Sequence, residues 1–453
     1  MTEDRTAAAV RPADEPRFAP ETAAREPRRP RTDLVLLGLE AGLFALAAAV
    51  GALLNHWRVP IHAPAAPLYA RWLPHLGPGT PLALAVAVAV VWRGPGLARR
   101  LPWRRLMVGG YLAAVGWIMS LALVDGWSRG LATRLTARAE YLHDVPRVHS
   151  ILGMLHTFSR HILDFQPGSW TTHVSGHPPG VFAIFVALDR VGLGGGGPAA
   201  MLCVLVGATA PVSVAVTLRA LRAEAAARTA LPFLVLFPGA VWVGASADGM
   251  FAGILAAGLA LLAVGGSRGG LGGGLLLGFS LYLSYGLLPA GALAIAVLWL
   301  RPAPRRGTAV ATVVGVAGVV AAFTASGFWW LDGYHLVVIR YYQGWAAGRP
   351  YGYWVWADLA CLLACAGPVL GPALRHLAAA RTRLCLIPAA ALLAIAVADL
   401  SGLSKAEVER IWLPYAIWLL VAAAWLPTRQ RQPWLAAQAL TALAINHLLL
   451  TYW

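Results

Sequence analysis

The sequence predicts an all-α membrane protein that crosses a lipid bilayer many times. Of its 453 residues, 58% are hydrophobic and only 12% are charged. Apolar segments of roughly 17–25 residues, long enough to span a bilayer as helices, recur along most of the chain. Lipid offers the backbone no hydrogen-bond partners, so we expect these segments to be helical. The pattern predicts about 12–14 transmembrane helices.

The basic residues lie in short stretches between the apolar segments. The formal net charge is +16, but this spacing is typical of cytoplasmic loops rather than of a nucleic-acid surface. We therefore expect membrane lipid, and no nucleic acid, beside these charges. The pattern predicts a multi-pass protein of the cell membrane with a cytoplasmic N-terminus. The basic stretches are 25–31, 93–105, 301–307, 375–383 and 427–432.

In chain order, four parts are expected. Residues 1–33 are rich in Pro, Ala, Arg and Glu and lack apolar periodicity, which predicts a disordered cytoplasmic tail. Residues 34–106 are expected to hold two transmembrane helices that precede the membrane core at 107–430. Residues 431–453 are expected to form a last transmembrane helix. Within the core, one of the segments 178–192 and 198–217 is not a simple span, because the two ends of the chain otherwise predict opposite sides for the basic stretch 218–228.

The largest predicted outer loop, residues 126–177, is rich in acids and histidines. Its stretch "VHSILGMLHTFSRHIL" has apolar residues at roughly helical spacing, which predicts an amphipathic helix on the outer surface. In the preceding stretch "EYLHD", Glu140 and Asp144 share one face if the segment is helical. Asp125 stands where a span emerges. The alternative for each acid is an ordinary solvated loop residue.

Further polar groups stand at other predicted outer positions. Asp248, in "SADGMF", begins a helix and has helix capping as its simpler explanation. Lys405 and Arg410, in "SKAEVERIWLP", have a salt-bridged helix entry as theirs. Arg340 lies in an aromatic stretch, 328–356, which also fits an interfacial aromatic belt. The four cysteines lie in apolar segments and are expected to act as small hydrophobic residues.

The order of these motifs resembles the GT-C superfamily of membrane glycosyltransferases, which use polyprenyl-phosphate sugars. The resemblance covers residues 107–430 and lies in the order of six motifs. An acidic outer-loop motif is followed by a proline pair that opens the next helix and by a proline-containing apolar helix. An acid at a helix start, a glycine-rich helix pair and a basic residue before a late helix come next. The family often has an adjacent Asp-Glu pair where this chain separates Glu140 from Asp144 by three residues. The motifs are "EYLHD", "HPPGVFAIFVAL", "LFPGAVWVG", "SADGMFAGILAAGLALL", "LGFSLYLSYGLLPAGALAIAVLWL" and "ERIWLPYAIWLLVAAAW".

The resemblance implies transfer of a sugar from a polyprenyl-phosphate donor to a glycan, lipid or protein acceptor on the outer face of the membrane. A carboxylate would take the proton of the acceptor hydroxyl, for which Asp144 or Glu140 is expected, with Asp125 third. Cations would stabilise the departing phosphate. A divalent cation is possible, with Asp248 as an acidic ligand, although the sequence has no dedicated metal motif. The candidates for donor-phosphate binding are Arg410, Lys405, Arg340, His177 and His173.

Two other functions compete with this one. A transporter or flippase for a lipid-linked saccharide would also be polytopic, but transporters tend to hold their ionisable groups at the middle of the membrane. A non-catalytic assembly protein with a GT-C-like fold is the other. Clustering of the ionisable groups in loops on one face favours the enzyme. The high Ala, Gly, Arg and Leu content suggests a GC-rich bacterial source and hence a role in the cell envelope.

Overall fold

The computed structural model describes residues 30–302 and 304–452 and is nearly all α, with 76% helix. One small antiparallel sheet is present in these ranges, formed by β1 (Ala70–Trp72) and β2 (Leu449–Thr451). The all-α fold class is thereby confirmed. Residues 1–29 of the predicted tail lie outside the described residues, whereas residues 30–33, assigned to the same tail, form the first turn of α1.

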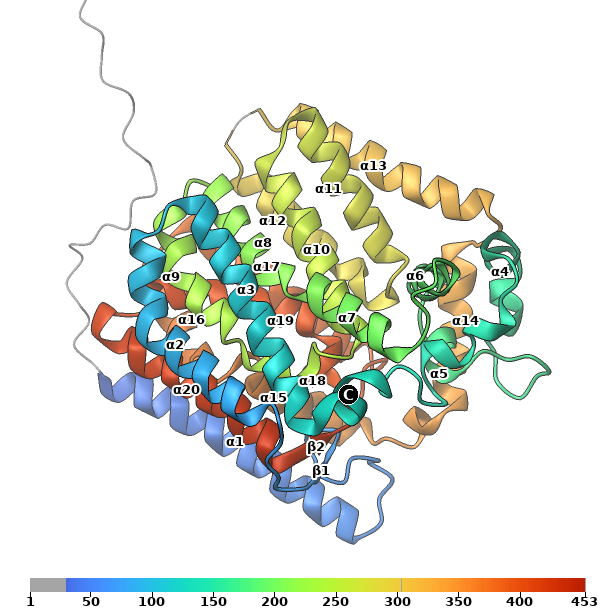
Figure 1. The fold of residues 1–453 in the computed structure, drawn as a ribbon, viewed down its shortest axis with the longest axis horizontal. Coiled ribbons are helices and arrows are strands. Elements are labelled where there is room, and N and C mark those ends of the chain that lie inside the picture. The colour runs from blue at the N-terminus through green and yellow to red at the C-terminus, as the bar shows by residue number, and fades with distance from the viewer. Residues whose placement is uncertain (1–29, 303, 453) are drawn as a thin grey trace, which may run out of the picture.

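The helices follow one another along the whole described chain (Figure 1). The first ten are α1 (Pro30–His56), α2 (Thr80–Arg100), α3 (Trp103–Ala122), α4 (Ile151–Thr157), α5 (Thr172–Ser175), α6 (Pro179–Arg190), α7 (Gly196–Gly207), α8 (Thr209–Ala220), α9 (Glu224–Val235) and α10 (Ala247–Val264). The second ten are α11 (Gly266–Leu281), α12 (Gly291–Leu300), α13 (Arg306–Ala325), α14 (Trp330–Gln343), α15 (Tyr351–Ala366), α16 (Leu370–Ala379), α17 (Leu386–Leu400), α18 (Val408–Ile411), α19 (Leu413–Leu419) and α20 (Thr428–Leu448).

Seven helical segments of the described chain are long and apolar enough to cross a membrane, or eight if the bent pair α15–α16 counts as one span. This confirms a fold compatible with a multi-pass membrane protein. Two further apolar helices, Tyr285–Leu300 and Leu413–Trp425, are shorter. The predicted 12–14 spans included segments of this shorter kind. The seven are Arg31–His56, Thr80–Arg100, Trp103–Asp125, Gly196–Ala220, Ala247–Val264, Arg306–Ala325 and Arg383–Leu400.

The two segments on which the predicted topology disagreed differ in length. Helix α6 has 12 residues, whereas a bilayer requires about 20. Helices α7 and α8 together form the continuous apolar segment Gly196–Ala220 of 25 residues. Helix α6 packs against α4, so it belongs with the folded loop 126–177. Of the two segments, only α7–α8 is therefore long and apolar enough to span a membrane.

Two basic stretches lie together at one end of the helices. Arg228, in α9, donates hydrogen bonds to the carbonyls of Ala98 (2.8 Å) and Leu101 (2.9 Å) at the end of α2. The guanidinium of Arg219 lies over the ring of Trp103 at 4.5 Å. These contacts bring the stretches 93–105 and 218–228 to the same end, as the positive-inside pattern requires. Which side of the membrane this end faces stays a prediction.

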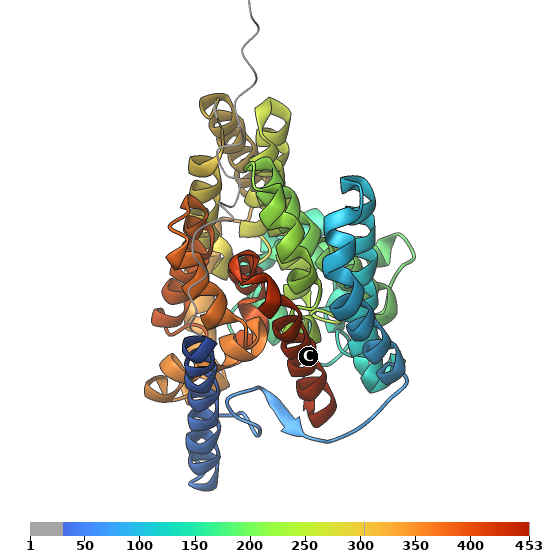
Figure 2. The same cartoon turned by 90° about the vertical axis from the view of Figure 1, so that its left-hand side faces the viewer.

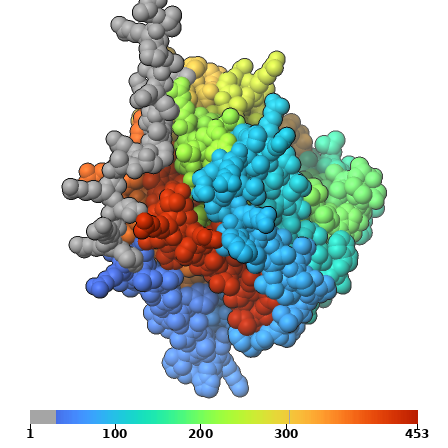
Figure 3. Space-filling view, turned by 60° about the vertical axis from the view of Figure 1, so that its left-hand side comes forward, coloured from blue at the N-terminus to red at the C-terminus, as the bar shows by residue number. Residues whose placement is uncertain are grey.

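The first helix is fixed to the bundle by charged side chains. Asp33 accepts a hydrogen bond from Arg375 at 2.7 Å, and Glu40 accepts one from the backbone N–H of Gly371 at 2.6 Å, so α1 lies along α15 and α16. The segment between α1 and α2 contains β1 and runs beneath the C-terminal helix α20 (Figure 2). The surface view shows the C-terminal helix between α1 and the α2–α3 pair (Figure 3). Helices α1 and α2 therefore contact different parts of the helix bundle.

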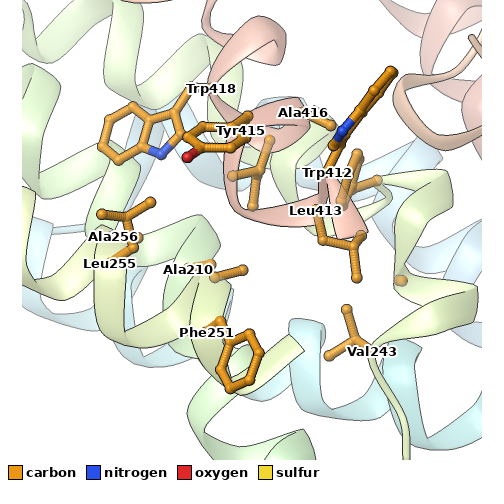
Figure 4. Close-up of a cluster of buried hydrophobic side chains, with 14 of the residues drawn as sticks. Ala210, Val243, Phe251, Leu255, Ala256, Trp412, Leu413, Tyr415, Ala416 and Trp418 are labelled. Atoms are coloured by element: carbon orange, nitrogen blue, oxygen red, sulfur yellow. The ribbon is translucent and has the colours of Figure 1, made fainter. Parts of the chain in front are cut away.

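The centre of the molecule is a close apolar contact between α10 and the late helix α19. Trp418 of α19 faces Leu255 and Ala256 of α10 (Figure 4), and all three are fully buried. Helix α10 also approaches α7 closely, because a Cβ added at Gly253 would lie 2.0 Å from the carbonyl oxygen of Val206. Small residues allow such close helix packing in membranes. This packing fixes the starts of α10 and α18, which carry the groups described next.

Candidate functional site

The stretch "EYLHD" does not form the single helical turn that its spacing suggested. Residues Tyr141–His143 and 145–147 form two short 3-10 turns. The segment is held by residues 171–173, because the N–H of His173 donates to the Ala139 carbonyl at 2.9 Å. As a result Glu140 and Asp144 have different partners instead of sharing one helix face. The predicted amphipathic helix is likewise shorter, with α4 followed by the 3-10 turn Phe158–His161.

A buried guanidinium, that of Arg410, lies at the meeting point of three distant segments. Arg410 lies in α18 and forms ion pairs with Asp248 of α10 and with Glu407, the latter at 2.8 Å. Its Nη2 also lies 3.2 Å from Nε2 of His173, in α5. Glu140 extends the group, since its Oε1 lies 3.3 Å from Nδ1 of His173. We name the set Glu140, His173, Asp248, Glu407 and Arg410 the Arg410 cluster.

The hydrogen bonds of the Arg410 cluster define the protonation state of His173. A guanidinium only donates, so Nε2 of His173 facing Arg410 must be the unprotonated nitrogen. We therefore infer that Nδ1 carries the proton, which it directs at the Ala139 carbonyl (2.9 Å) and at Glu140. Burial, with Arg410 second, lowers the pKa of His173 to about 4. The imidazole is thus neutral near pH 7 and connects Glu140 to Arg410.

The pKa values of two carboxyl groups of the cluster are shifted in opposite directions. Burial raises the pKa of Glu140 to about 8, with Asp248 adding to the rise and Arg410 opposing it. Burial also raises the pKa of Glu407, but Arg410 and Arg349 outweigh it and hold that pKa below its ordinary value. Glu407 is therefore a permanent anion near neutral pH. Glu140 exchanges its proton near neutral pH, as a general base must.

The loop that carries Glu407 has an unusual backbone. Ala406 and Glu407 both have positive φ, 67° and 65°, in the left-handed region that non-glycine residues seldom adopt. Such conformations persist where surrounding contacts hold them, often at functional sites. Here Arg349 donates to the Lys405 carbonyl (2.7 Å) and to Glu407 (2.9 Å), while the Lys405 ammonium donates to the Arg349 carbonyl (3.0 Å). This reciprocal pairing holds the loop against the segment that precedes α15.

Lys405 therefore lies beside the Arg410 cluster, with its ammonium already bonded to a backbone oxygen. Its Nζ also lies 5.7 Å from the centre of the Tyr341 ring and 5.6 Å from that of Tyr342, a cation–π arrangement. Glu407 and Arg349 were not among the predicted site residues. The charged stretch 404–414 pointed to Glu407, but no spacing in the sequence connects Arg349 to it.

Asp144 and Asp125 lie outside the Arg410 cluster. Asp144 is buried and accepts hydrogen bonds from Arg147 (2.8 Å) and from the backbone N–H of Thr171 (2.8 Å), which makes it a support of the loop. Asp125 is held by three cationic or protonatable side chains at the end of α3. Its partners are His75 (3.0 Å), Arg129 (3.0 Å) and Arg134 (3.4 Å).

The remaining predicted phosphate ligands divide between two places. His177 directs its Nδ1 at the His173 carbonyl (2.9 Å), and its ring lies 5.7 Å from that of Phe251 in α10, so it forms a wall of the Arg410 cluster. Arg340, in α14, is paired with Asp164 at 2.7 Å. Arg340 and Asp144 line a separate polar cavity of about 490 Å³. The structure thus brings together Glu140, His173, His177, Asp248, Lys405 and Arg410 but places Asp125, Asp144 and Arg340 elsewhere.

Asp248 is part of an ion pair and hydrogen-bond network at the helix start. The helix cap is Ser246, whose hydroxyl oxygen accepts from the N–H of Asp248 at 3.1 Å, so the capping explanation for Asp248 itself is wrong. The Ser246 hydroxyl lies 3.0 Å from the Asp248 carboxylate, which also faces Arg410. Within residues 30–302 and 304–452, no three His, Cys, Asp or Glu side chains are grouped so as to hold a metal ion. The divalent cation considered from the sequence stays a prediction.

The Arg410 cluster combines a carboxyl group that titrates near neutral pH with a buried guanidinium one histidine away. Such a group can accept a proton beside a cation that stabilises developing negative charge. No model of a known protein family matches the sequence, and a search of curated proteins found no significant match.

Proposed function

We propose that this protein is a membrane glycosyltransferase that moves a sugar from a polyprenyl-phosphate donor to an envelope glycan, lipid or protein acceptor. The observation that carries the proposal is the line from Glu140 through His173 to Arg410, which joins a titratable carboxyl group to a buried cation. Sugar transfer from a lipid phosphate needs these two groups close together: one takes the acceptor proton, and the other stabilises the leaving phosphate.

Glu140 is the proposed general base. Of the three acids considered from the sequence, it alone belongs to the Arg410 cluster, while Asp144 and Asp125 have charged partners elsewhere. A base with a pKa near the working pH combines a useful unprotonated fraction with a strong driving force for proton transfer. Its partner His173 stays neutral and positions the carboxylate through Nδ1.

Arg410 is the proposed phosphate-binding residue, with Arg349 and Lys405 behind it. Arg410 pairs with Asp248 and Glu407, and Arg349 also pairs with Glu407. A donor phosphate would take the place of one of these carboxylates on Arg410, because the guanidinium fork matches phosphate oxygens as it matches carboxylate oxygens. The donor lipid chain would lie along the apolar helix surfaces within the bilayer. The active face is proposed to be extracytoplasmic.

A direct assay tests this function. Purified protein in lipid vesicles is given polyprenyl-phosphate-linked mannose or arabinose, each radiolabelled, together with an envelope extract as acceptor. We expect one donor to yield labelled product and Glu140→Gln to lower turnover at least about 10²-fold, as loss of a general base does. Asp144→Asn, four residues away and outside the Arg410 cluster, is the matched control and should retain turnover per folded molecule at saturating acceptor. Equal activity of wild type and Glu140→Gln contradicts the proposal.

A second candidate, a transporter for a lipid-linked saccharide, is favoured by one feature. Asp358 is buried in the middle of α15, near Asp399 and Glu409. Carboxyl groups inside transmembrane helices are typical of proton-coupled transporters. Movement of labelled lipid-linked saccharide across vesicle membranes without formation of a new glycosidic bond would favour this candidate over the enzyme.

A further inference from the structure

A polar cavity is lined by the same backbone segments that carry Glu140 and His173 of the Arg410 cluster. The cavity encloses about 490 Å³ and is lined by residues that include Arg138, Ala139 and Thr172. Ala139 and Thr172 are the direct neighbours of Glu140 and His173 in the sequence. The two segments are joined by the hydrogen bond from the His173 N–H to the Ala139 carbonyl. A ligand in the cavity is therefore separated from the Arg410 cluster by the thickness of one pair of backbone segments.

Three arginines from two distant parts of the chain line this cavity, which we name the arginine cavity. They are Arg138, Arg147 and Arg340, and they face the two carboxylates of Asp144 and Asp164. Three guanidinium groups against two carboxylates leave one positive charge unbalanced. The cavity volume lies within the range of roughly 300–1,000 Å³ that small-molecule sites occupy.

The three arginines differ in their availability. The Arg147 guanidinium already donates hydrogen bonds to Asp144 and to the carbonyls of Gly168 and Ser169. Arg340 is nine-tenths buried and bonds Asp164 through Nη1, while its buried Nε has no hydrogen-bond partner among the described residues. Arg138 is exposed and makes no hydrogen bond or ion pair with any described residue. Arg138 and Arg340 thus have N–H groups available for an anion.

We propose that the arginine cavity binds a phosphate ester carried by the acceptor. The planar guanidinium fork matches phosphate oxygens with paired, charge-assisted hydrogen bonds, and the Thr172 hydroxyl adds a neutral donor at the wall. The inference rests on the proposed function, because only a transferase has an acceptor. Phosphate bound beside Ala139 would anchor the acceptor at the backbone segment that carries Glu140.

The phosphate can belong to a lipid headgroup or to a soluble phosphorylated saccharide. Two probes distinguish these sources with the purified full-length protein. Glycerol 1-phosphate tests the soluble form by calorimetry in detergent. Nanodiscs of phosphatidylcholine with or without phosphatidylinositol test the lipid form by native mass spectrometry. We expect saturable binding of at least one probe, and at least tenfold weaker binding by Arg138→Gln and by Arg340→Gln.

Arg160→Gln is the matched control for Arg138→Gln. Arg160 is exposed in the same loop, makes no hydrogen bond or ion pair with any described residue, and does not line the cavity. Phosphate binding should be unchanged in this variant. Arg340→Lys keeps the positive charge but loses the guanidinium shape, so it should bind phosphate more tightly than Arg340→Gln. Affinity unchanged in Arg138→Gln and Arg340→Gln, or weakened equally in Arg160→Gln, overturns the proposal. Absence of saturable binding to both probes overturns it as well.

The transfer assay separates this inference from the function on which it rests. If sugar transfer occurs, Arg138→Gln should raise the KM for the acceptor at least tenfold and leave the KM for the donor unchanged. A rise in the donor KM alone shows that the cavity holds the donor, which contradicts the inference while the transferase stands. Arg138-dependent binding of phosphate in a protein without transferase activity rejects the proposed function but preserves the cavity as an anion site.

Discussion

Arg410 and Asp248 stand 162 positions apart in the chain and form a buried ion pair where α18 meets the start of α10. The pair is possible because α19, which begins at Leu413, packs against α10, with Trp418 facing Leu255 (Figure 4). The apolar contact and the charged contact are therefore parts of one interface. His173 and Glu407 complete it from two other segments.

Replacing Arg410 by alanine should destabilise the protein severely. The change leaves the carboxylate of Asp248 buried without its cation and leaves Glu407 with Arg349 alone, and breaking a buried pair in this way costs about 3–5 kcal/mol. The melting temperature in detergent measures the loss. Arg410→Lys keeps the charge and should retain the fold, yet it should weaken use of the lipid-phosphate donor because the fork is lost. Full donor affinity in Arg410→Lys would exclude Arg410 from the donor site.

Replacing Asp144 by asparagine should affect stability rather than chemistry. The change removes the charged bond to Arg147 and weakens acceptance from the Thr171 N–H, which is expected to cost about 1–3 kcal/mol of unfolding free energy. Turnover per folded molecule at saturating acceptor should stay within about threefold of wild type, far from the 10²-fold loss expected for a general base. A loss of 100-fold with normal thermal stability would make Asp144 the base instead of Glu140.

The rate should increase with pH through the pKa of Glu140. Burial raises this pKa to about 8, so most molecules carry a protonated, inactive base at pH 6.5 and an unprotonated one at pH 9. We expect kcat/KM to rise about tenfold per pH unit below pH 8 and to level above it. Glu140→Gln should lack this rise. A wild-type profile that is flat between pH 6 and 9 is incompatible with Glu140 as the base.

His173 should make the fold sensitive to acid. Burial, with Arg410 next, lowers its pKa from 6.5 to about 4 in the folded protein, so the unfolded chain takes up a proton first as the pH falls. Its contribution to the unfolding free energy is present above pH 6.5 and is lost between pH 6.5 and 4. His173→Asn keeps a hydrogen-bond donor but does not titrate. The difference in melting temperature between wild type and this variant should therefore change across that range, and a constant difference would exclude the effect.

Cysteine labelling should place the predicted outer loop outside the cell. Phe165 is 82% exposed at the tip of the loop, and Arg381 lies in the basic stretch 375–383. In a Cys385→Ser background, which removes the exposed native thiol, Phe165→Cys should react with an impermeant reagent in intact cells, and Arg381→Cys only after lysis. The reverse pattern would invert the proposed orientation.

Periodicity and composition predicted the helical, membrane-spanning fold, because these features depend on each segment separately. They also directed attention to the acids and histidines of the loop 126–177. They did not distinguish Glu140 from Asp144, since that choice depends on which direction each side chain takes from two irregular 3-10 turns. The pairing of Arg349 with Glu407 was not predictable, because left-handed backbone at Ala406 and Glu407 is set by tertiary contacts.

Seven or eight helices of the described chain are long and apolar enough to span a membrane, and the number 12–14 stays a prediction. Local hydropathy treats every apolar segment alike, but α6 has only 12 residues and packs on the outer loop, and the bent pair α15–α16 turns by 85°. Helix α20, the predicted last span, has 21 residues but begins with the polar stretch "TRQRQP" and is not among the seven apolar spans of the described chain. Whether such a helix crosses the bilayer depends on its neighbours.

The role of Glu140 is tested most directly by comparing envelope glycans and lipids by mass spectrometry. The strains are a deletion strain of the source organism and the same strain complemented with wild type, Glu140→Gln or Asp144→Asn, each at equal membrane level. We expect a glycan or glycolipid lacking one sugar in the deletion strain and in the Glu140→Gln strain, and a normal profile with wild type and Asp144→Asn. A normal profile with Glu140→Gln would contradict the assignment of Glu140 as the base and favour transport or assembly.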